Sequence, residues 1–386
     1  MKGIVAAAMS GGVDSAVTAA LLKQDGYDVI GITLQIWQEH SDTGKYGGCC
    51  SLGAVEDARR AATRIGIPHY VLNFREYFAD KVIDNFVSEY AKGRTPNPCV
   101  ECNRSVKFEE LLRHARNLGA DYLATGHYAR IRLDEASGRY QLMRAVDTTK
   151  DQSYALYTLG QEALSRTLMP LGKLAGKHET RRIANELGLA LANKPDSQEI
   201  CFVPREGYVS FLEQKAPSIL KSGPIVDLTG RQLGTHEGIA LYTIGQRKRL
   251  PGGSTRPMVV VSLDAQTNTV VVGYEEDLLQ QDFAVENCTW SAIAGIFGEV
   301  ETLTKIRYNG VAAPATISPV GSDHEVTGKF VSPQRAITPG QAAVFYGGER
   351  EEYGQVVLGG GTLDELTSHA NAAPIRLEEG ALTPLC

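Results

Sequence analysis

A glycine-rich turn close to the N-terminus constrains this chain more than any other stretch. Residues 3–8 form a short apolar run typical of a buried parallel strand, and residues 16–22 favour a helix with one apolar face. Between them lies Met-Ser-Gly-Gly-Val-Asp-Ser, residues 9–15. Gly11 and Gly12 let the backbone adopt left-handed angles and approach a ligand closely, and the amides at the helix start favour an anion. The stretch therefore predicts a phosphate-binding loop, although it is not a Walker A loop, because no Gly-Lys-Ser/Thr follows.

The segments after this loop predict an open α/β domain. Apolar runs at residues 27–34, 68–73 and 121–128 are typical of further strands, and residues 54–62 form a clear helix between two of them. This alternation of strand and helix predicts a doubly wound parallel sheet with helices on both faces. Ligands of such sheets bind at the carboxyl ends of the strands, where the glycine-rich loop and Leu34 both lie.

The second half of the chain has a different texture. From residue 223, short β-type runs such as residues 241–249 alternate with Gly and Pro turns. This pattern predicts a small β-rich central domain and a C-terminal β-barrel. A hairpin is expected earlier, at residues 130–144. The expected parts are a nucleotide-binding catalytic domain at residues 1–205, a central domain at 206–275, the barrel at 276–366 and a tail at 367–386.

Composition limits the class of protein. The formal net charge is −6, which argues against a general nucleic-acid coat but leaves room for a local basic face. The sequence contains no run of about 18 apolar residues and enters a strand almost at once, so we expect a cytoplasmic protein without a membrane span or a signal peptide. Eight cationic residues are expected to gather on one face: Arg94, Arg104, Lys150, Arg247, Lys248, Arg249, Lys305 and Arg307.

Seven cysteines in a cytoplasmic chain are more typical of catalysis, metal binding or burial than of structural disulfides. Cys99 and Cys102 form a C-x-x-C pair, which fits a redox pair, half of a zinc site or coincidence. The vicinal Cys49 and Cys50 would make a poor second half of a zinc site. Cys201 is isolated in sequence, and its plain alternative is a small buried apolar residue.

The surroundings of Cys102 indicate why its thiol could be reactive. Two prolines and a glycine predict a shaped loop over residues 93–104, with a helix resuming at Val106. Cys102 is therefore expected near a helix N-terminus, where the helix dipole and the unpaired amides favour a thiolate.

Several motifs together give the chain a resemblance to known enzymes. The Ser-Gly-Gly-Val-Asp-Ser loop between strand and helix resembles the PP-loop of ATP pyrophosphatases. Further motifs in the same order extend this to a resemblance with the tRNA-specific 2-thiouridylase family (MnmA/TrmU type), as far as Gly361. They are Gly-Arg-Thr-Pro-Asn-Pro at 93–98, Cys-Asn at 102–103, Thr-Gly-His-Tyr at 125–128, Lys-Asp-Gln-Ser-Tyr at 150–154, Asp-Ser at 196–197 with Ile-Cys-Phe at 200–202, Tyr-Thr-Ile-Gly-Gln-Arg at 242–247, Lys-Ile-Arg-Tyr at 305–308, Thr-Pro-Gly-Gln at 338–341 and Leu-Gly-Gly-Gly at 358–361.

The resemblance implies a PP-loop domain that serves an ATP-dependent tRNA sulfurtransferase. ATP, with Mg²⁺, would adenylate the C2 oxygen of the wobble uridine, because an amide-like oxygen is a poor leaving group, and AMP and pyrophosphate would be released. Cys201, loaded as a persulfide by a sulfur-donor or relay protein, would supply the sulfur. Cys102 would be the partner thiolate that ends in a transient disulfide with Cys201. The target uracil would have to be flipped out to reach both thiols.

The same resemblance assigns the binding residues. Those expected around ATP are Ala8, Met9, Ser10, Gly11, Gly12, Val13, Asp14, Ser15, Leu34 and Gly126, with the Ser10 and Ser15 hydroxyls as donors. Those expected at tRNA are Asn97, Pro98 and Cys99, which would line the target base, and His127, Lys150, Asp151, Gln152, Arg307, Tyr308 and Gln341. The plain alternatives are a structural turn residue for His127 and a solvated strand charge for Arg307.

One position departs from the family, and two other functions stay open. Many members have aspartate where this chain has Cys99, and a thiol there takes away an acid or base for the uracil. Cys99, Cys102 and Cys201 could instead ligate three irons of a [4Fe–4S] cluster, which is a second hypothesis.

The chain could also be another PP-loop ligase, forming an amide or a lysidine without need of Cys102 or Cys201. A third reading is a non-catalytic tRNA-binding protein with a relic nucleotide site.

Overall fold

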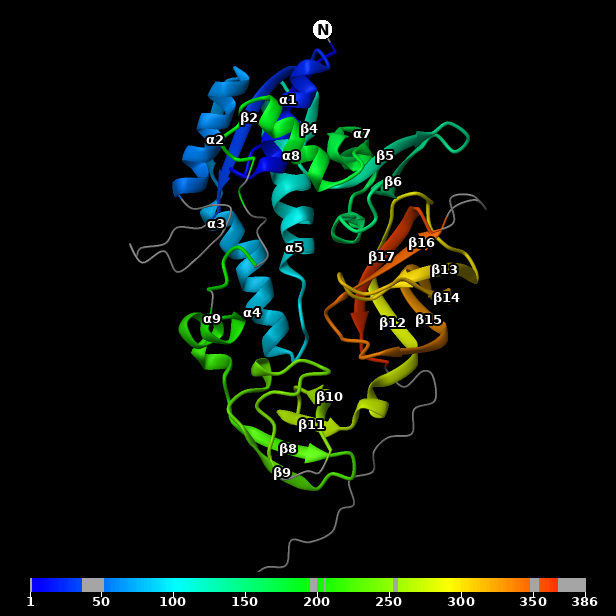
Figure 1. Cartoon of the computed structure of the whole chain (residues 1–386). Coiled ribbons are helices and arrows are strands. Elements are labelled where there is room, and N and C mark those ends of the chain that lie inside the picture. The colour runs from blue at the N-terminus through cyan, green and yellow to red at the C-terminus, as the bar shows by residue number, and fades with distance from the viewer. Residues whose placement is uncertain are drawn as a thin grey trace, which may run out of the picture.

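The computed structural model describes residues 2–36, 52–192, 194, 200–204, 206–252, 256–347 and 354–366. Within these ranges, the N-terminal part contains a five-stranded parallel sheet of order β3-β2-β1-β4-β7 (Figure 1). The predicted parallel sheet is thereby confirmed. Its strands are β1 (Ile4–Ala8), β2 (Asp28–Gln35), β3 (His69–Asn73), β4 (Tyr122–Ala124) and β7 (Thr167–Leu168).

Helices cover both faces of this sheet, as the alternation along β1 requires. Val5 and Ala7 belong to one apolar cluster, and Ala6 belongs to the other, because successive side chains of a strand point to opposite faces. The first cluster is completed by α1 (Val13–Gln24), α2 (Leu52–Ile65) and α8 (Lys177–Glu186). The second is completed by helices that run from Arg75 to Asn117: α3 (Arg75–Phe78), η1 (Ala79–Ile83), α4 (Asp84–Ala91), α5 (Pro98–Glu101), η2 (Cys102–Leu111) and α6 (Leu112–Asn117).

The helix that carries Cys102 begins earlier than the sequence suggested. The loop predicted over residues 93–104 ends at Asn97, and a continuous helix starts at Pro98. Proline is tolerated at the first helical position because its missing N–H has no partner there. The Asn97 side chain accepts the Val100 N–H at 3.3 Å and caps the helix. Cys102 therefore lies one turn inside the helix.

Several short elements complete this domain and lead out of it. Before α8 come η3 (Ser153–Leu156), α7 (Gln161–Ser165) and η4 (Pro170–Lys173), and after it α9 (Tyr208–Lys215) and η5 (Pro217–Ile219) lead to the central region. The central region then forms a four-stranded sheet of order β10-β11-β8-β9 over a core that includes Ile225, Val260 and Val270. Its elements are β8 (Gly223–Asp227), β9 (Gln232–His236), η6 (Ile239–Leu241), β10 (Val259–Asp264), β11 (Thr269–Gly273) and η7 (Glu275–Leu278).

The strand expected over residues 241–249 is wrong. The chain there leaves η6 and folds back on itself, because the Gln246 side-chain amide donates to the carbonyl oxygens of Leu241 and Lys248. The Tyr242 hydroxyl donates to the Arg249 carbonyl at 2.9 Å, which closes the same turn.

The predicted C-terminal barrel is confirmed. In the described part of the chain, β12 pairs with both β15 and β17, so six antiparallel strands close around Phe283, Ile317, Phe330 and Phe345. Because β12 and β17 pair with each other, the six-stranded barrel has no gap between its first and last strands. The strands are β12 (Leu279–Trp290), β13 (Val300–Lys305), β14 (Ala313–Val320), β15 (Ser322–Arg335), β16 (Ala342–Gly347) and β17 (Val356–Asp364).

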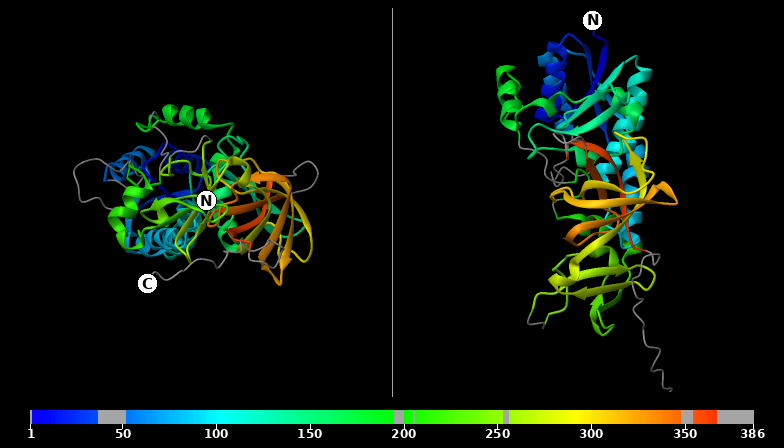
Figure 2. Two further views of the ribbon diagram at one scale, coloured as in Figure 1. Left: turned by 90° about the horizontal axis from the view of Figure 1, so that it is seen from below. Right: turned by 90° about the vertical axis from the view of Figure 1, so that its right-hand side faces the viewer.

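The barrel is also joined to the first domain through backbone pairing. The predicted hairpin is present as β5 (Ala129–Asp134) and β6 (Arg139–Arg144), and β6 pairs with β17 through Leu142 and Met143. The parallel sheet and the central domain lie at opposite ends of the molecule, and the barrel lies beside the helices between them (Figure 2). Across the residues described, no helix has the length and apolarity needed to cross a membrane.

Candidate active site

The glycine-rich loop has the geometry of a backbone anion cradle. Gly11 has φ +72°, and a Cβ there would lie 2.2 Å from the Ala54 carbonyl oxygen, so only glycine fits. Gly12 has extended backbone and is the N-cap of α1. The Ser15 hydroxyl donates to the Gly12 carbonyl at 3.0 Å and accepts the Ser10 N–H at 3.1 Å. Ser15 thus organises the loop from within, whereas the side chain of Ser10 is exposed.

Other members of the predicted ATP set contribute backbone rather than side chains. Met9 and Val13 are buried, and Ala8 is half-buried. The Met9 N–H donates to Ile32 at 2.7 Å, and its carbonyl accepts the Thr33 hydroxyl at 2.6 Å. These bonds fix the end of β1 against β2, so the loop leaves the sheet in one direction.

Two lysines from later segments reach the loop, and sequence reasoning missed both. Lys177, the first residue of α8, donates to Asp14 Oδ2 at 2.6 Å, and the Tyr128 hydroxyl donates to Asp14 Oδ1 at 2.8 Å. Lys194 Nζ donates to the Gly11 carbonyl at 2.9 Å and to Asp57 Oδ2 at 2.8 Å. A Walker A loop carries its own lysine, whereas here the positive charge comes from distant sequence without a local signal.

Gly126 and Leu34 lie at the same edge of the sheet as the loop, as expected. A Cβ on Gly126 would lie 2.9 Å from the backbone of Asp14 and Ser15, so the turn after β4 rests directly on the loop. Leu34 is half-buried near the carboxyl end of β2, which runs parallel to β1.

His127, the next residue, is a poor cation at neutral pH. Burial and the nearby charge of Lys107 hold its pKa well below the usual range for histidine. Its Nδ1 lies 2.9 Å from the Thr125 hydroxyl, and its ring lies 5.9 Å from that of Phe108. This environment suits a neutral, structurally held imidazole.

The two predicted catalytic thiols lie in one apolar cluster on the same face of the sheet. Cys102 is buried within that cluster, and Cys201 is half-buried and packs against it. Phe202 anchors the segment that bears Cys201, because its ring is 5.7 Å from Phe78 and 5.2 Å from Phe86. The structure thereby fixes the Cys201 segment on the helices that precede Cys102.

The iron–sulfur hypothesis has no support in the described residues. No group of three or more His, Cys, Asp or Glu side chains in that part of the chain, which includes Cys99, Cys102 and Cys201, could hold a metal ion. Cys288 lies in the barrel core, where burial raises the pKa of its thiol to about 12. Cys49 and Cys50 lie outside the described residues.

Residues predicted for tRNA from two different domains converge near Cys99. Burial raises the pKa of Tyr308, and the nearby Asp151 and Cys99 raise it further, whereas a hydrogen bond with Gln152 lowers it. The Tyr308 ring packs edge-on against Tyr154 at 6.0 Å. Cys99 is exposed, and Tyr308 of the barrel lies close enough for its pKa to be affected by this thiol.

Several of these side chains already have partners inside the protein. The Asp151 carboxylate accepts the N–H groups of Ala145 and Ser153. The Gln152 side chain accepts the Tyr128 N–H at 2.9 Å. Three others are arranged as follows: Arg307 donates to the Ala336 carbonyl and the Thr338 hydroxyl, Gln341 donates to the Thr95 carbonyl, and Lys150 is exposed. Most of the set shapes the surface, and direct contact with tRNA stays a prediction.

Comparison with known proteins decides the family. Family profiles match three successive stretches: "tRNA methyl transferase HUP domain" at residues 3–205, "tRNA methyl transferase PRC-barrel domain" at 209–274 and "Aminomethyltransferase beta-barrel domain" at 280–363. The "tRNA-specific 2-thiouridylase MnmA" of Heliobacterium modesticaldum is 53% identical over 94% of this chain and 93% of its own length. The chain belongs to the MnmA family. A relative from Thermoanaerobacter pseudethanolicus, "tRNA-specific 2-thiouridylase MnmA 1", is 50% identical over 93% of this chain and 97% of its own.

Solved structures resemble this MnmA-family chain only loosely. A 4-thiouridine synthetase–RNA complex with bound ATP covers 56% of this chain and 51% of its own, with 19% identity and a TM-score of 0.35. A likeness this weak has no bearing on function.

The basic face expected for this MnmA-family chain is wrong for Arg94. Its side chain is only 16% exposed and ion-pairs with Glu89, Glu286 and Asp364. Arg104 and Arg247 are more exposed, but each pairs with a glutamate. Arg94 therefore does not contribute an exposed positive charge to that face.

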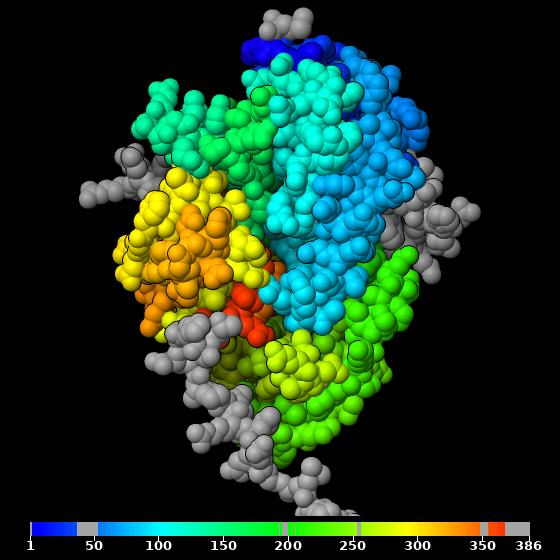
Figure 3. Space-filling model, turned by 180° about the vertical axis from the view of Figure 1, so that it is seen from behind, coloured from blue at the N-terminus to red at the C-terminus, as the bar shows by residue number. Residues whose placement is uncertain are grey.

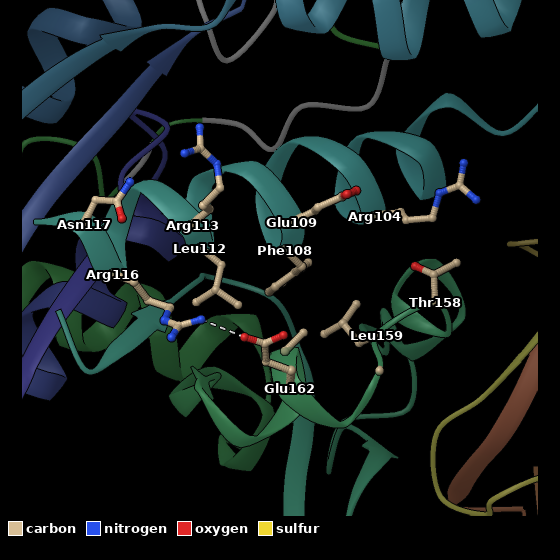
Figure 4. Close-up of a pocket in the computed structure, with 12 residues that line it drawn as sticks. Arg104, Phe108, Glu109, Leu112, Arg113, Arg116, Asn117, Thr158, Leu159 and Glu162 are labelled. Carbon is tan, nitrogen blue, oxygen red and sulfur yellow. Dashed lines mark hydrogen bonds and ion pairs between the residues drawn. The ribbon is translucent and has the colours of Figure 1, made fainter. Parts of the chain in front are cut away.

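A pocket of about 730 Å³ opens along η2, α6 and α7 (Figure 4). Phe108, Leu112 and Leu159 lie between its polar rims, and Arg116 forms a 2.8 Å ion pair with Glu162 across it. Arg104 of the expected basic face lines this pocket, but none of the residues predicted for ATP, the target base or sulfur transfer does.

Proposed function

We propose that this protein is an ATP-dependent tRNA 2-thiouridylase that replaces the C2 oxygen of the wobble uridine with sulfur. One observation carries the proposal: the glycine-rich anion cradle and both candidate thiols belong to the same domain, and the thiols share one apolar cluster. The names of the MnmA relatives agree with this function.

The first step in this proposal is adenylation. The uracil C2 oxygen attacks the α-phosphorus of ATP, and pyrophosphate leaves. The amides of the loop, with Lys177 and Lys194 beside it, would stabilise the charge on the departing pyrophosphate. Mg²⁺ would arrive with the triphosphate, since it is usually held by substrate phosphates and one or two carboxylates, and Asp14 is the carboxylate that the loop provides.

The second step is sulfur transfer. The terminal sulfur of a Cys201 persulfide attacks C2, and AMP leaves with the oxygen. The Cys102 thiolate then attacks the Cys201 sulfur, the S–S bond to the transferred sulfur breaks, and 2-thiouridine is released. A Cys102–Cys201 disulfide remains, and an external thiol must reduce it before the next cycle.

The test is mass analysis of tRNA nucleosides after incubation with ATP and a persulfide donor as the sulfur source. We expect 2-thiouridine at the wobble position, together with AMP and pyrophosphate. Cys201→Ser and Cys102→Ser should abolish repeated turnover with a persulfide donor. If both variants kept full activity toward an amine substrate instead, an amide- or lysidine-forming ligase would replace this proposal.

A further inference from the structure

We propose that Arg94 is a positioning residue through which the C-terminal barrel sets the placement of the Cys102 helix. The relevant group, here called the Arg94 cluster, consists of Arg94, Glu89, Glu286 and Asp364. The inference rests on the proposed function for its catalytic consequence. Its structural basis is independent of that function.

The two terminal nitrogens of the Arg94 guanidinium donate hydrogen bonds in this cluster, and Nε takes part through an ion pair. Nε lies 2.8 Å from Glu89 on α4 without a hydrogen bond, and Nη1 donates to Asp364 on β17 at 2.8 Å. Nη2 pairs with Glu286 on β12 and also lies 3.4 Å from the Leu363 carbonyl. A planar fork with fixed donor directions can bridge several acceptors in this way, and lysine cannot. Arg94 therefore binds one helix end to two neighbouring strands of the barrel.

The residue after Arg94 is fastened to the same face of the barrel. The Thr95 N–H donates to the Pro339 carbonyl at 2.9 Å, and the Thr95 carbonyl accepts the Gln341 amide at 2.8 Å. Gly340 has φ +88°, and a Cβ there would lie 2.9 Å from the Thr95 nitrogen. The backbone of the loop thus lies directly on the barrel, with no room for a side chain between them.

The central domain holds this loop from another side. The Thr95 hydroxyl donates to the Thr243 hydroxyl at 3.3 Å. In Figure 3, the red atoms near the end of the barrel lie against blue atoms of the first domain and next to the yellow-green central domain. Three parts of the chain therefore meet at Arg94 and Thr95.

This junction stands immediately before the catalytic helix. Asn97, two residues after Thr95, caps the helix that contains Cys99 and Cys102. Only Pro96 and Asn97 separate Thr95 from the first residue of the helix, so a shift of the Thr95 backbone would also shift the start of the helix. Misplacement of a reacting group by about 1 Å can cost on the order of 100-fold in rate. The barrel thus serves the chemistry by holding the thiol of Cys102 in register, besides providing surface for tRNA.

Charge balance makes the cluster sensitive to loss of Arg94. Among the described residues, three carboxylates of the Arg94 cluster surround one guanidinium, and the only other cation paired with them is Lys92, 3.0 Å from Glu89. Without Arg94 the carboxylates of α4, β12 and β17 repel one another, and partly buried charges lose their partner. Loosening should occur at this junction first.

The experiment compares Arg94→Gln and Arg94→Lys with a matched control, Arg256→Gln. Arg256 also pairs with a glutamate, Glu276, but both side chains are more than half exposed and lie far from the loop in sequence. We expect Arg94→Gln to lower kcat for thiolation by ~10- to 100-fold, with the KM values for ATP and tRNA changed by less than about threefold. Arg94→Lys should recover only part of kcat, and Arg256→Gln should match the native protein.

A second readout separates this inference from the proposed function. Alkylation of Cys102 by iodoacetamide in the protein alone, followed by peptide mass analysis, reports how well the helix start is held. We expect Arg94→Gln to increase the rate at Cys102 by at least ~10-fold and Arg256→Gln to leave it unchanged. If the native protein fails to thiolate tRNA, the proposed function falls while the alkylation result still decides this inference. Unchanged alkylation and kcat in Arg94→Gln, or a defect confined to the KM for tRNA, would overturn it. If Arg94→Gln does not fold, Glu286→Gln and Asp364→Asn carry the same measurements.

Discussion

Replacing Gly11 with alanine should damage the anion cradle, and the structure gives the size of the effect. Gly11 has φ +72°, where an alanine costs about 1–2 kcal/mol. Its new Cβ would lie 2.2 Å from the Ala54 carbonyl oxygen, which is backbone and cannot rotate away. Overpacking of this kind adds about 1–3 kcal/mol. The substitution should therefore destabilise the first domain by about 2–5 kcal/mol.

The neighbouring Gly12 offers a matched control within the same loop. Its φ of −100° and ψ of 161° suit any residue, and a Cβ there would come no closer than 3.4 Å to another atom, the Ser10 Oγ. Gly12→Ala should thus leave the free energy of unfolding nearly unchanged. Differential scanning calorimetry without nucleotide compares the two variants on the protein alone.

The expected result is a Tm lowered by about 4 °C or more in Gly11→Ala and by no more than about 1 °C in Gly12→Ala. A domain of this size shifts by roughly 2–4 °C per kcal/mol. The displaced loop of Gly11→Ala should also raise the KM for ATP by ~10-fold or more. Equal Tm values for the two variants, or a larger loss in Gly12→Ala, would refute the reasoning.

Three further predictions concern the surroundings of the loop and the thiols. Phe202→Ala should cost about 3–5 kcal/mol in urea unfolding and abolish thiolation, whereas Phe202→Leu should cost less, because the ring anchors the Cys201 segment on Phe78 and Phe86. Lys194→Gln should raise the KM for ATP or lower kcat for pyrophosphate release by ~10-fold, since a charge-assisted hydrogen bond contributes about 1.5–3 kcal/mol, and the exposed Lys173→Gln should change neither. The pKa of His127 is held well below 6.5 in the folded protein, so the unfolded chain binds this proton first as the pH falls. The contribution of neutral His127 to the free energy of unfolding should be complete above pH 6.5 and should fall by up to about 1.4 kcal/mol per pH unit below it. The native protein should therefore lose more Tm between pH 7 and pH 5 than His127→Gln, and an equal loss in both would contradict this.

The parts of the fold that sequence could predict rest on short-range signals. Strand, turn and helix follow one another directly here, and each is specified by its own residues: the apolar run at residues 3–8, the two glycines and the helix former after them. The structure has β1, the loop and α1 at these positions. The closing barrel was likewise predictable from short strands between turns, since each strand carries its own alternation.

Residue propensities gave the wrong secondary structure where a side-chain hydrogen bond to the backbone stabilised a different one. Proline disfavours a helix interior, and the sequence therefore predicts a loop at Pro98; with Asn97 as cap, Pro98 is instead the first residue of the helix. Residues 241–249 have β-type composition, yet the Gln246 amide satisfies carbonyls of its own turn and leaves no strand to form. Both outcomes depend on hydrogen bonds that propensity does not describe.

The contacts that matter most to the site join residues far apart in the chain. Lys177 and Lys194 meet the loop from more than 160 residues away, and Arg94 meets Asp364 across 270 residues. Nothing near these residues in sequence marks a partner, so Arg94 was expected on an exposed basic face. The pairing of β6 with β17 could not be predicted either, because the residues of an edge strand do not determine which distant strand pairs with it.

The central claim is that the nucleotide loop and the two thiols act on the same uridine, and coupled product analysis tests it most directly. Native protein, tRNA, ATP and a persulfide donor are combined, and AMP and 2-thiouridine are measured in one reaction. We predict equal amounts of AMP and wobble 2-thiouridine, with Cys201→Ser still releasing tRNA-dependent pyrophosphate but forming no 2-thiouridine. Undiminished thiolation in Cys201→Ser, or AMP release by the native protein without sulfur in the tRNA, would contradict the account.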